Sequence, residues 1–326
     1  MAELYPLKFK TIFKDKIWGG QKIKTVLNKD YGDLPNCGET WEISGVKGNI
    51  SIVREGPLAG KDLQHLLMEY QGKLVGENVY KKFTNEFPLL VKFIDANADL
   101  SVQVHPDDAL AKKRHNSFGK TEMWYIFQAD DDATLNAGFN RPLTREQYLD
   151  YVQQGQLMDI LNIEHVKSDD VYFLPAGRVH YIGKGCLLAE IQQTSDVTYR
   201  IYDFDRRDDH GNKRELHTDE SLDAIDFTYH NDYKSEYQDR ENEVVKLVSC
   251  EYFTTNKLHC NKLIERDFSK LDSFVIYVCM EGGLVLDYGD GKIEMQKGEA
   301  VLVPALFSKI SMIPKGAFKV LESYIA

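Results

Sequence analysis

Two histidines, a glutamate and a glutamine stand at spacings that could build a metal site. Gln103 and His105 are two residues apart, so on a strand both side chains point to the same face. Glu122 begins a short apolar run, and His180 follows another that ends at Pro175. Nitrogen and oxygen ligands without a thiolate suit zinc, manganese, iron(II), cobalt or nickel. These side chains predict one divalent metal ion, and the common use of His with Glu favours zinc.

The segments that must position these ligands have the pattern of buried strands. Residues 100–105 are rich in β-branched side chains and alternate until Pro106 ends the run. Residues 122–127 and 171–175 are short apolar or aromatic runs. We therefore expect three strands to bring the ligands together.

The whole chain has the size and composition of a two-domain globular protein. It has 326 residues, and 43% of them are hydrophobic. No apolar stretch approaches the roughly 20 residues of a membrane span. The first residues show no signal-peptide pattern. We therefore expect a cytoplasmic location and no membrane partner.

Charge and cysteine content exclude further classes. The net charge of −11 disfavours nucleic acid as a partner, because phosphate backbones are held by clustered Lys and Arg. A local basic pocket could still bind a single phosphate. The five cysteines are scattered and never spaced as Cys-x-x-Cys, which excludes a disulfide framework and a thiolate metal site. The oligomeric state stays open.

Helical spacing interrupts the strand pattern in two places. Leu63, Leu66 and Tyr70 recur at helical spacing and predict an insert near residues 60–86. A capping box at Thr144 predicts a second helical insert near residues 142–162.

The pattern returns to short strands and turns from about residue 235, which is typical of a sandwich or jelly roll. Residues 168–176 and 297–305 share a polar turn, an apolar strand and Pro-Ala, so one unit could occur twice. Only the first copy continues to a histidine. We predict a mainly β fold of two jelly-roll domains, a metal-binding one over 1–235 with the helical inserts and a degenerate one over 236–326.

The ligand segments resemble the two metal-binding motifs of the cupin fold, a jelly roll that presents ligands from facing strands. Pro175, Gly177 and His180 match the second motif, whereas Gln103 replaces the first histidine of the first motif. The order Gln-x-His, Lys-x-Glu and Pro-Ala-Gly-x-x-His is similar to that of the type I phosphomannose isomerases. This resemblance is strong over residues 88–200 and faint after residue 235.

The resemblance implies site residues and a reaction. The family's metal ligands fall on Gln103, His105, Glu122 and His180, and its active-site arginine falls on Arg200. The family interconverts mannose 6-phosphate and fructose 6-phosphate through an enediol intermediate. A metal-dependent isomerase with a small phosphosugar substrate is therefore expected.

Three cationic side chains suit this chemistry. A proton beside a carbonyl becomes removable when a metal and a guanidinium stabilise the developing enediolate. Arg200 stays protonated and would stabilise charge or clamp the substrate rather than act as a base. Lys120 and Lys92 are candidates for proton transfer or phosphate contact, and a base role requires burial or a nearby cation to lower the lysine pKa.

One departure from the family limits the transfer of roles. Longer members continue from the arginine into Leu-Thr-Pro-Lys, whereas this chain continues from Ile201 to Arg206 without that lysine. The chain looks like the short bacterial form, in which Arg206 or Arg207 could compensate for the lysine.

Two other classes of function stay open. A non-enzymatic cupin that binds sugar phosphates could have kept a structural metal. A cupin oxygenase would bind iron(II), but such sites are usually richer in histidine and have no obvious use for Gln103 with Arg200.

Overall fold

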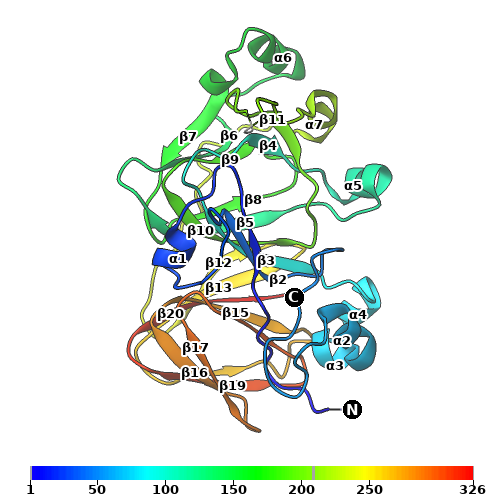
Figure 1. Cartoon of the computed structure of the whole chain (residues 1–326), viewed down its shortest axis with the longest axis vertical. Coiled ribbons are helices and arrows are strands. Elements are labelled where there is room, and N and C mark those ends of the chain that lie inside the picture. The colour runs from blue at the N-terminus through cyan, green and yellow to red at the C-terminus, as the bar shows by residue number, and fades with distance from the viewer. Residues whose placement is uncertain (1, 208–209, 326) are drawn as a thin grey trace.

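The protein, seen in a computed structural model that describes residues 2–207 and 210–325, is built from four β-sheets stacked along its longest axis (Figure 1). Strand pairs within the four sheets are antiparallel. The first sheet has, in spatial order, β1 (Ile12–Lys14), β2 (Glu39–Ile43), β3 (Leu89–Asp95), β10 (Cys186–Gln193), β5 (Glu122–Ala129) and β8 (Val171–Leu174). The second has β11 (Tyr199–Tyr202), β4 (Val102–Val104), β9 (His180–Ile182), β6 (Thr134–Phe139) and β7 (Leu161–His165).

The other two sheets belong to the second half of the chain, drawn in yellow to red in Figure 1. The third sheet has, in order, β12 (Val244–Ser249), β13 (Thr254–Cys260), β20 (Phe318–Tyr324), β15 (Val275–Glu281) and β18 (Ala300–Val303). The fourth has β14 (Ile264–Asp267), β19 (Lys309–Pro314), β16 (Gly283–Asp287) and β17 (Lys292–Gln296).

The first sheet is buried on both faces, which explains why its central strands β3 and β10 are nearly continuous apolar runs. On one face Trp124 and Leu188 pack against Leu135 of the second sheet. On the other face Val91 and Ile191 belong to a core that extends into the third and fourth sheets. The site side chains are the polar exceptions on the face toward the second sheet.

Helices lie around the sheets rather than between them. Tyr148 and Leu222 pack α6 and α7 against the outer face of the second sheet, where Val102 lies. The predicted capping box of α6 is confirmed, because Thr144 and Gln147 exchange side-chain and backbone hydrogen bonds. The helices are α1 (Lys22–Thr25), α2 (Leu63–Tyr70), α3 (Gly72–Val75), α4 (Glu77–Phe83), α5 (Asp108–His115), α6 (Arg145–Gln153), the 3-10 helix η1 (Leu157–Ile160) and α7 (Thr218–Ala224). Among the described residues, no helix has the length and apolar character to cross a membrane.

The second half repeats the strand order of the first. The order β3-β10-β5-β8 returns as β13-β20-β15-β18, and β4-β9-β6-β7 returns as β14-β19-β16-β17. Strands β8 and β18 both end at Pro-Ala and take the same place in their sheets, as the sequence echo predicts. The predicted fold class, mainly β with two jelly rolls and small helical inserts, is confirmed. The boundary near residue 235 stays a prediction.

Candidate metal centre and active site

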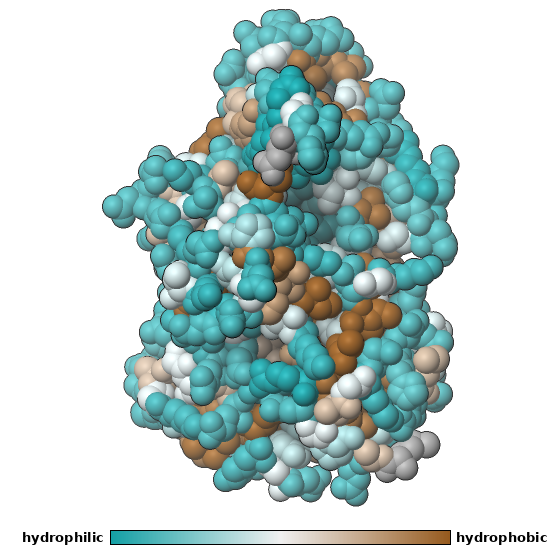
Figure 2. Space-filling model, in the orientation of Figure 1, coloured by the Kyte–Doolittle hydropathy of each residue, from teal (hydrophilic) through white to brown (hydrophobic). Residues whose placement is uncertain are grey.

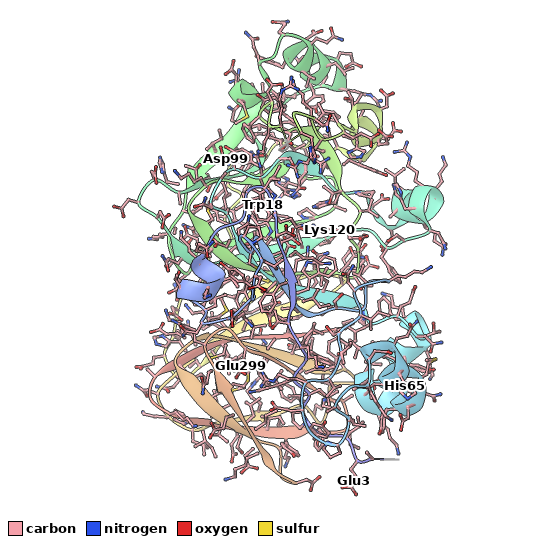
Figure 3. All side chains as sticks on the ribbon, viewed as in Figure 1. Glu3, Trp18, His65, Asp99, Lys120 and Glu299 are labelled. Atoms are coloured by element: carbon pink, nitrogen blue, oxygen red, sulfur yellow. The ribbon has the colours of Figure 1, made fainter. Side chains whose placement is uncertain are left out.

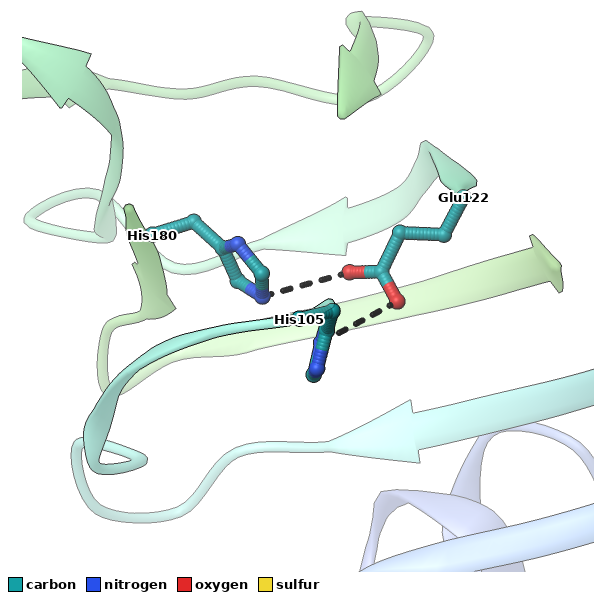
Figure 4. A group of neighbouring side chains, drawn as sticks. All are labelled: His105, Glu122 and His180. Carbon is teal, nitrogen blue, oxygen red and sulfur yellow. Dashed lines mark ion pairs between the residues drawn. The ribbon is translucent and has the colours of Figure 1, made fainter. Parts of the chain in front are cut away.

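Three buried side chains from separate segments meet between the first two sheets. Glu122 begins β5, His180 begins β9, and His105 follows the last residue of β4. The Glu122 carboxylate faces both imidazoles, 3.5 Å from His105 Nε2 and 3.3 Å from His180 Nε2 (Figure 4). One ligand atom of each residue lies within 4.8 Å of the others. This His–Glu–His cluster could hold a metal ion.

The surroundings of both imidazoles suit metal binding. Nδ1 of His105 lies 3.0 Å from the Val197 carbonyl oxygen, and Nδ1 of His180 lies 2.8 Å from that of Arg178. Each Nδ1 therefore carries the proton, and the Nε2 lone pair points into the cluster. Burial, assisted by Lys120, lowers the pKa of His180 to about 3 and that of His105 well below its usual value. Both rings are neutral, as metal ligation requires.

The cluster already attracts a cation. The Lys120 ammonium lies 2.5 Å from Glu122 Oε2 and 2.8 Å from His105 Nε2. Nε2 of His180 and Oε1 of Glu122 are buried without a hydrogen-bond partner. Burial and the nearby Glu190 raise the pKa of Glu122 despite Lys120, so a positive ion here would stabilise the ionised carboxylate. The donor set thus fits a divalent metal.

Strand register places Gln103 beside the cluster. Gln103 pairs with His180 on β9 and with Arg200 on β11. Directly paired residues project to the same face of a sheet, so the three side chains form a row. The strand predicted over residues 100–105 is only Val102–Val104, because the His105 carbonyl leaves the ladder and accepts a hydrogen bond from Gly177 N at 2.9 Å. Ligation by Gln103 stays a prediction.

A cavity of about 320 Å³ adjoins the cluster. The surface is hollowed on the face shown in Figure 2, in the region where Figure 3 labels Trp18 and Lys120. All three candidates for catalysis, Arg200, Lys120 and Lys92, line this cavity together with Gln103. The other lining residues are Lys16, Trp18, Glu39, Trp41, Ile94, Leu100, Ser101, Ile182, Glu190, Asp196, Thr198 and Arg214.

Lys92 is held as a cation by a carboxylate that the sequence analysis missed. Its ammonium lies 3.0 Å from Glu190 Oε1, and Trp124 Nε1 donates to Glu190 Oε2 at 2.9 Å. Burial alone would lower the pKa of Lys92, but Glu190 and Glu39 outweigh it and raise that pKa. Lys92 is therefore better suited to hold charge than to act as a base. Glu190 is the one charged residue in the apolar strand β10, and this isolated charge could have indicated a site residue.

Two arginines mark the other end of the cavity. Arg200 Nη1 donates to the Glu215 carbonyl oxygen at 2.7 Å, and its buried Nε has no hydrogen-bond partner. Arg214, which no sequence motif indicated, also lines the cavity. Arg206 and Arg207, the residues expected to compensate for the missing family lysine, do not line it.

Fold and site together define a cupin protein of two jelly rolls, the first of which carries the His–Glu–His cluster that could hold a metal. Residues 6–128 match the family description "Phosphomannose isomerase type I, catalytic domain", and residues 243–325 match "Mannose-6-phosphate isomerase, cupin domain". The chain belongs to the type I phosphomannose isomerase family.

Curated relatives and a solved structure agree over nearly the full length. The chain is 34% identical to the probable mannose-6-phosphate isomerase GmuF of Bacillus subtilis, covering 94% of this chain and 96% of that protein. It is 33% identical to the mannose-6-phosphate isomerase of Streptococcus mutans, covering 93% of each. The crystal structure of the mannose 6-phosphate isomerase from Bacillus subtilis superposes with a TM-score of 0.86 at 30% identity, covering 98% of this chain and 99% of that one.

Proposed function

We propose that this protein is a metal-dependent isomerase that interconverts mannose 6-phosphate and fructose 6-phosphate by proton transfer through an enediol intermediate. The observation that carries the proposal is the cavity beside the His–Glu–His cluster, because Lys120 lines its wall and contacts the cluster, and two arginines line the same wall. Family membership and relatives named as mannose-6-phosphate isomerases support the substrate.

The metal would be held by His105, Glu122 and His180, with Gln103 as the fourth ligand. We favour zinc because a borderline ion suits two imidazoles with oxygen ligands. When bound, the metal supplies Lewis-acid stabilisation of substrate oxygens that become negative as the proton leaves.

Lys120 is the side chain we assign to proton transfer. It both contacts the cluster and lines the cavity, so its ammonium lies where the reacting carbons would meet the metal-binding end. A general acid or base must first lie within hydrogen-bonding distance of the reacting group, and its pKa matters only once that condition is met.

Arg200 and Lys92 supply fixed positive charge. Arg200 remains protonated at any ordinary pH, so its partly buried guanidinium can clamp the anionic substrate in the cavity. Lys92, paired with Glu190, contributes to the potential at the cavity wall and orients that carboxylate. Neither side chain is assigned to removal of the proton.

Composition of the cavity wall suits an anionic sugar. Lysine or arginine occupies five wall positions, at Lys16, Lys92, Lys120, Arg200 and Arg214, although the chain as a whole carries a charge of −11. Three carboxylates, Glu39, Glu190 and Asp196, line the same wall, so cations are in modest excess there, which favours a phosphate monoester. A cytoplasmic location, and the exclusion of nucleic-acid and membrane partners, stay predictions from the sequence.

A coupled assay of fructose 6-phosphate formation from mannose 6-phosphate tests the proposal. We expect turnover by the purified protein, loss of turnover after chelation, and recovery when zinc is added back. Parallel additions of manganese, iron(II), cobalt and nickel test the choice of metal. Metal-loaded protein that binds mannose 6-phosphate without turnover would contradict the proposal and favour the sugar-phosphate-binding alternative.

A further inference from the structure

The cavity has two chemically different ends. At one end Lys120 contacts the His–Glu–His cluster, and at the other end Arg200 and Arg214 line the wall. Register places Arg200 two strands away from His180 on the same sheet face. Neighbouring strands are about 4.8 Å apart, so the backbones of Arg200 and His180 are about 10 Å apart, with Gln103 between them. A ligand with a carbonyl at one end and a charge at the other fits this arrangement.

Three of the wall cations already have carboxylate partners. Lys16 lies 3.3 Å from Glu39. The Lys92 and Lys120 ammonium groups pair with Glu190 and Glu122, as described above. Their positive charge is therefore largely neutralised within the protein itself. The two arginines differ from these lysines, because a guanidinium has five N–H donors: Arg214 keeps donors for an anion after pairing with Asp203, and Arg200 has no carboxylate partner among the described residues.

Arg214 is held rigidly at the wall. Its Nε donates to Asp203 Oδ2 at 2.7 Å and its Nη2 donates to Oδ1 of the same carboxylate. Asp203 is 5% exposed, and its two hydrogen bonds fix the plane of the guanidinium. The loop that follows β11 thus returns a cation to the cavity.

Arg200 lacks such a carboxylate. Across residues 2–207 and 210–325, no carboxylate oxygen lies within ion-pair distance of its guanidinium, and its buried Nε has no hydrogen-bond partner. Burial and then the positive charge of Arg214 lower the pKa of Arg200. The two guanidinium groups therefore repel each other, and an anion placed between them would relieve both the repulsion and the unsatisfied donor.

We propose that Arg214, together with Arg200, binds the phosphate group of the sugar phosphate. The inference rests on the proposed function for the identity of the sugar. With the reacting carbons at the His–Glu–His cluster, the phosphate at the other end of the carbon chain reaches the arginines. Guanidinium groups match phosphate oxygens by paired hydrogen bonds, which an ammonium cannot do. Arg214 thus takes the anion-binding place that Arg206 and Arg207 were expected to fill.

Steady-state kinetics of Arg214→Gln and Arg207→Gln test the inference. Arg207 lies on the same loop, is exposed, and does not line the cavity, so it is the matched control. For Arg214→Gln we expect KM for mannose 6-phosphate and the inhibition constant of inorganic phosphate to rise together by about 10- to 100-fold, the worth of a hydrogen bond to a charged group. Little change in kcat or metal content is expected, and Arg207→Gln should match the wild type.

A second variant covers a failure of Arg214→Gln to fold. Arg214→Lys keeps a positive charge for Asp203 but loses the paired geometry, so it should still raise the inhibition constant of phosphate. Unchanged KM and phosphate inhibition in the folded variants would overturn the inference. Wild-type protein that binds inorganic phosphate at Arg214 but never isomerises mannose 6-phosphate would overturn the proposed function instead.

Discussion

The two halves of the molecule share one strand arrangement but differ in the side chains that could bind a metal. In the first half Glu122 faces Leu174, the residue before Pro175; in the second half Val275 faces Val303, the residue before Pro304. A valine thus stands where the first half has its central carboxylate. His180 also differs from its counterpart, because Lys309 follows Pro304 at the same distance but is exposed. The scaffold is common to both halves, and a few side chains decide which half can bind a metal.

A buried glutamate is common to both halves and shows the difference more sharply. Glu190 in β10 and Glu322 in β20 hold equivalent register positions. Glu190 accepts hydrogen bonds from Lys92 and Trp124 and still lines the cavity. The Glu322 carboxylate accepts four hydrogen bonds from side chains of the second half. The donors are Arg266 Nε and Nη2 at 2.8 Å each, Asn256 Nδ2 at 2.9 Å and Tyr277 OH at 3.0 Å. Both glutamates pair with a cation, but Glu190 does so at the wall of a cavity, whereas Glu322 uses its hydrogen bonds inside the core of the second half.

The largest expected effect comes from replacing, in each half, the residue that stands five positions after the proline of Pro-Ala. His180→Ala should abolish metal binding and turnover, because it removes a buried ligand whose Nε2 has no other partner. The loss should exceed about 100-fold, the upper range for removing only a supporting hydrogen-bond partner of a ligand. Metal analysis and the isomerase assay measure it, with Lys309→Ala as the control. Equal loss in both variants would break the comparison.

Removal of the Arg200 guanidinium should separate catalysis from metal binding. Arg200→Ala should lower kcat/KM by about 10²-fold, because a sugar phosphate that loses its clamping guanidinium is no longer positioned for the reaction. The metal content should match the wild type, because Arg200 does not contact the cluster. Retained turnover in this variant would show that the arginine is not part of the reaction.

In the second half, an arginine should matter for stability alone. Arg266→Leu leaves the fully buried Glu322 without its cation and should cost roughly 3 kcal/mol in the free energy of unfolding. Adding Glu322→Gln should recover most of this cost, because the amide keeps hydrogen-bonding partners without a buried charge. Chemical denaturation measures both variants. A drop in kcat/KM for folded Arg266→Leu protein would contradict the separation of roles.

The smallest expected effect concerns the helical insert α6. Thr144→Ala removes the side-chain cap of this helix and should lower the free energy of unfolding by about 1 kcal/mol. Turnover should be unchanged, since α6 packs on the outer face of the second sheet, away from the cavity. A change in KM would show that the insert is coupled to the active site.

Local patterns were sufficient to predict the centre of the site. Glu122 and His180 each begin a short strand and His105 directly follows one, so strand alternation indicates which way these side chains point. Facing strands of a jelly roll then bring them together. The capping box at Thr144 was readable for the same reason, since its hydrogen bonds span three residues.

Long-range pairing and loop geometry were not readable from the sequence. Glu190 belongs to the site because β10 lies between β3 and β5, a neighbourhood that no local pattern encodes. Arg214 reaches the cavity through a loop whose path depends on its pair with Asp203, so residue type alone led to Arg206 and Arg207 instead. The sequence echo also did not reveal which side chains of β19 face the core. In the structure Ile310 is buried and Lys309 is exposed.

Metal content and turnover, measured together while chelated protein is titrated with zinc, test most directly whether one half alone carries the active site. The predicted result is one ion per chain, with turnover that rises in proportion to bound metal up to one equivalent and neither metal nor turnover in His180→Ala. Full turnover by metal-free protein, or His180→Ala that still binds one ion and turns over, would contradict it.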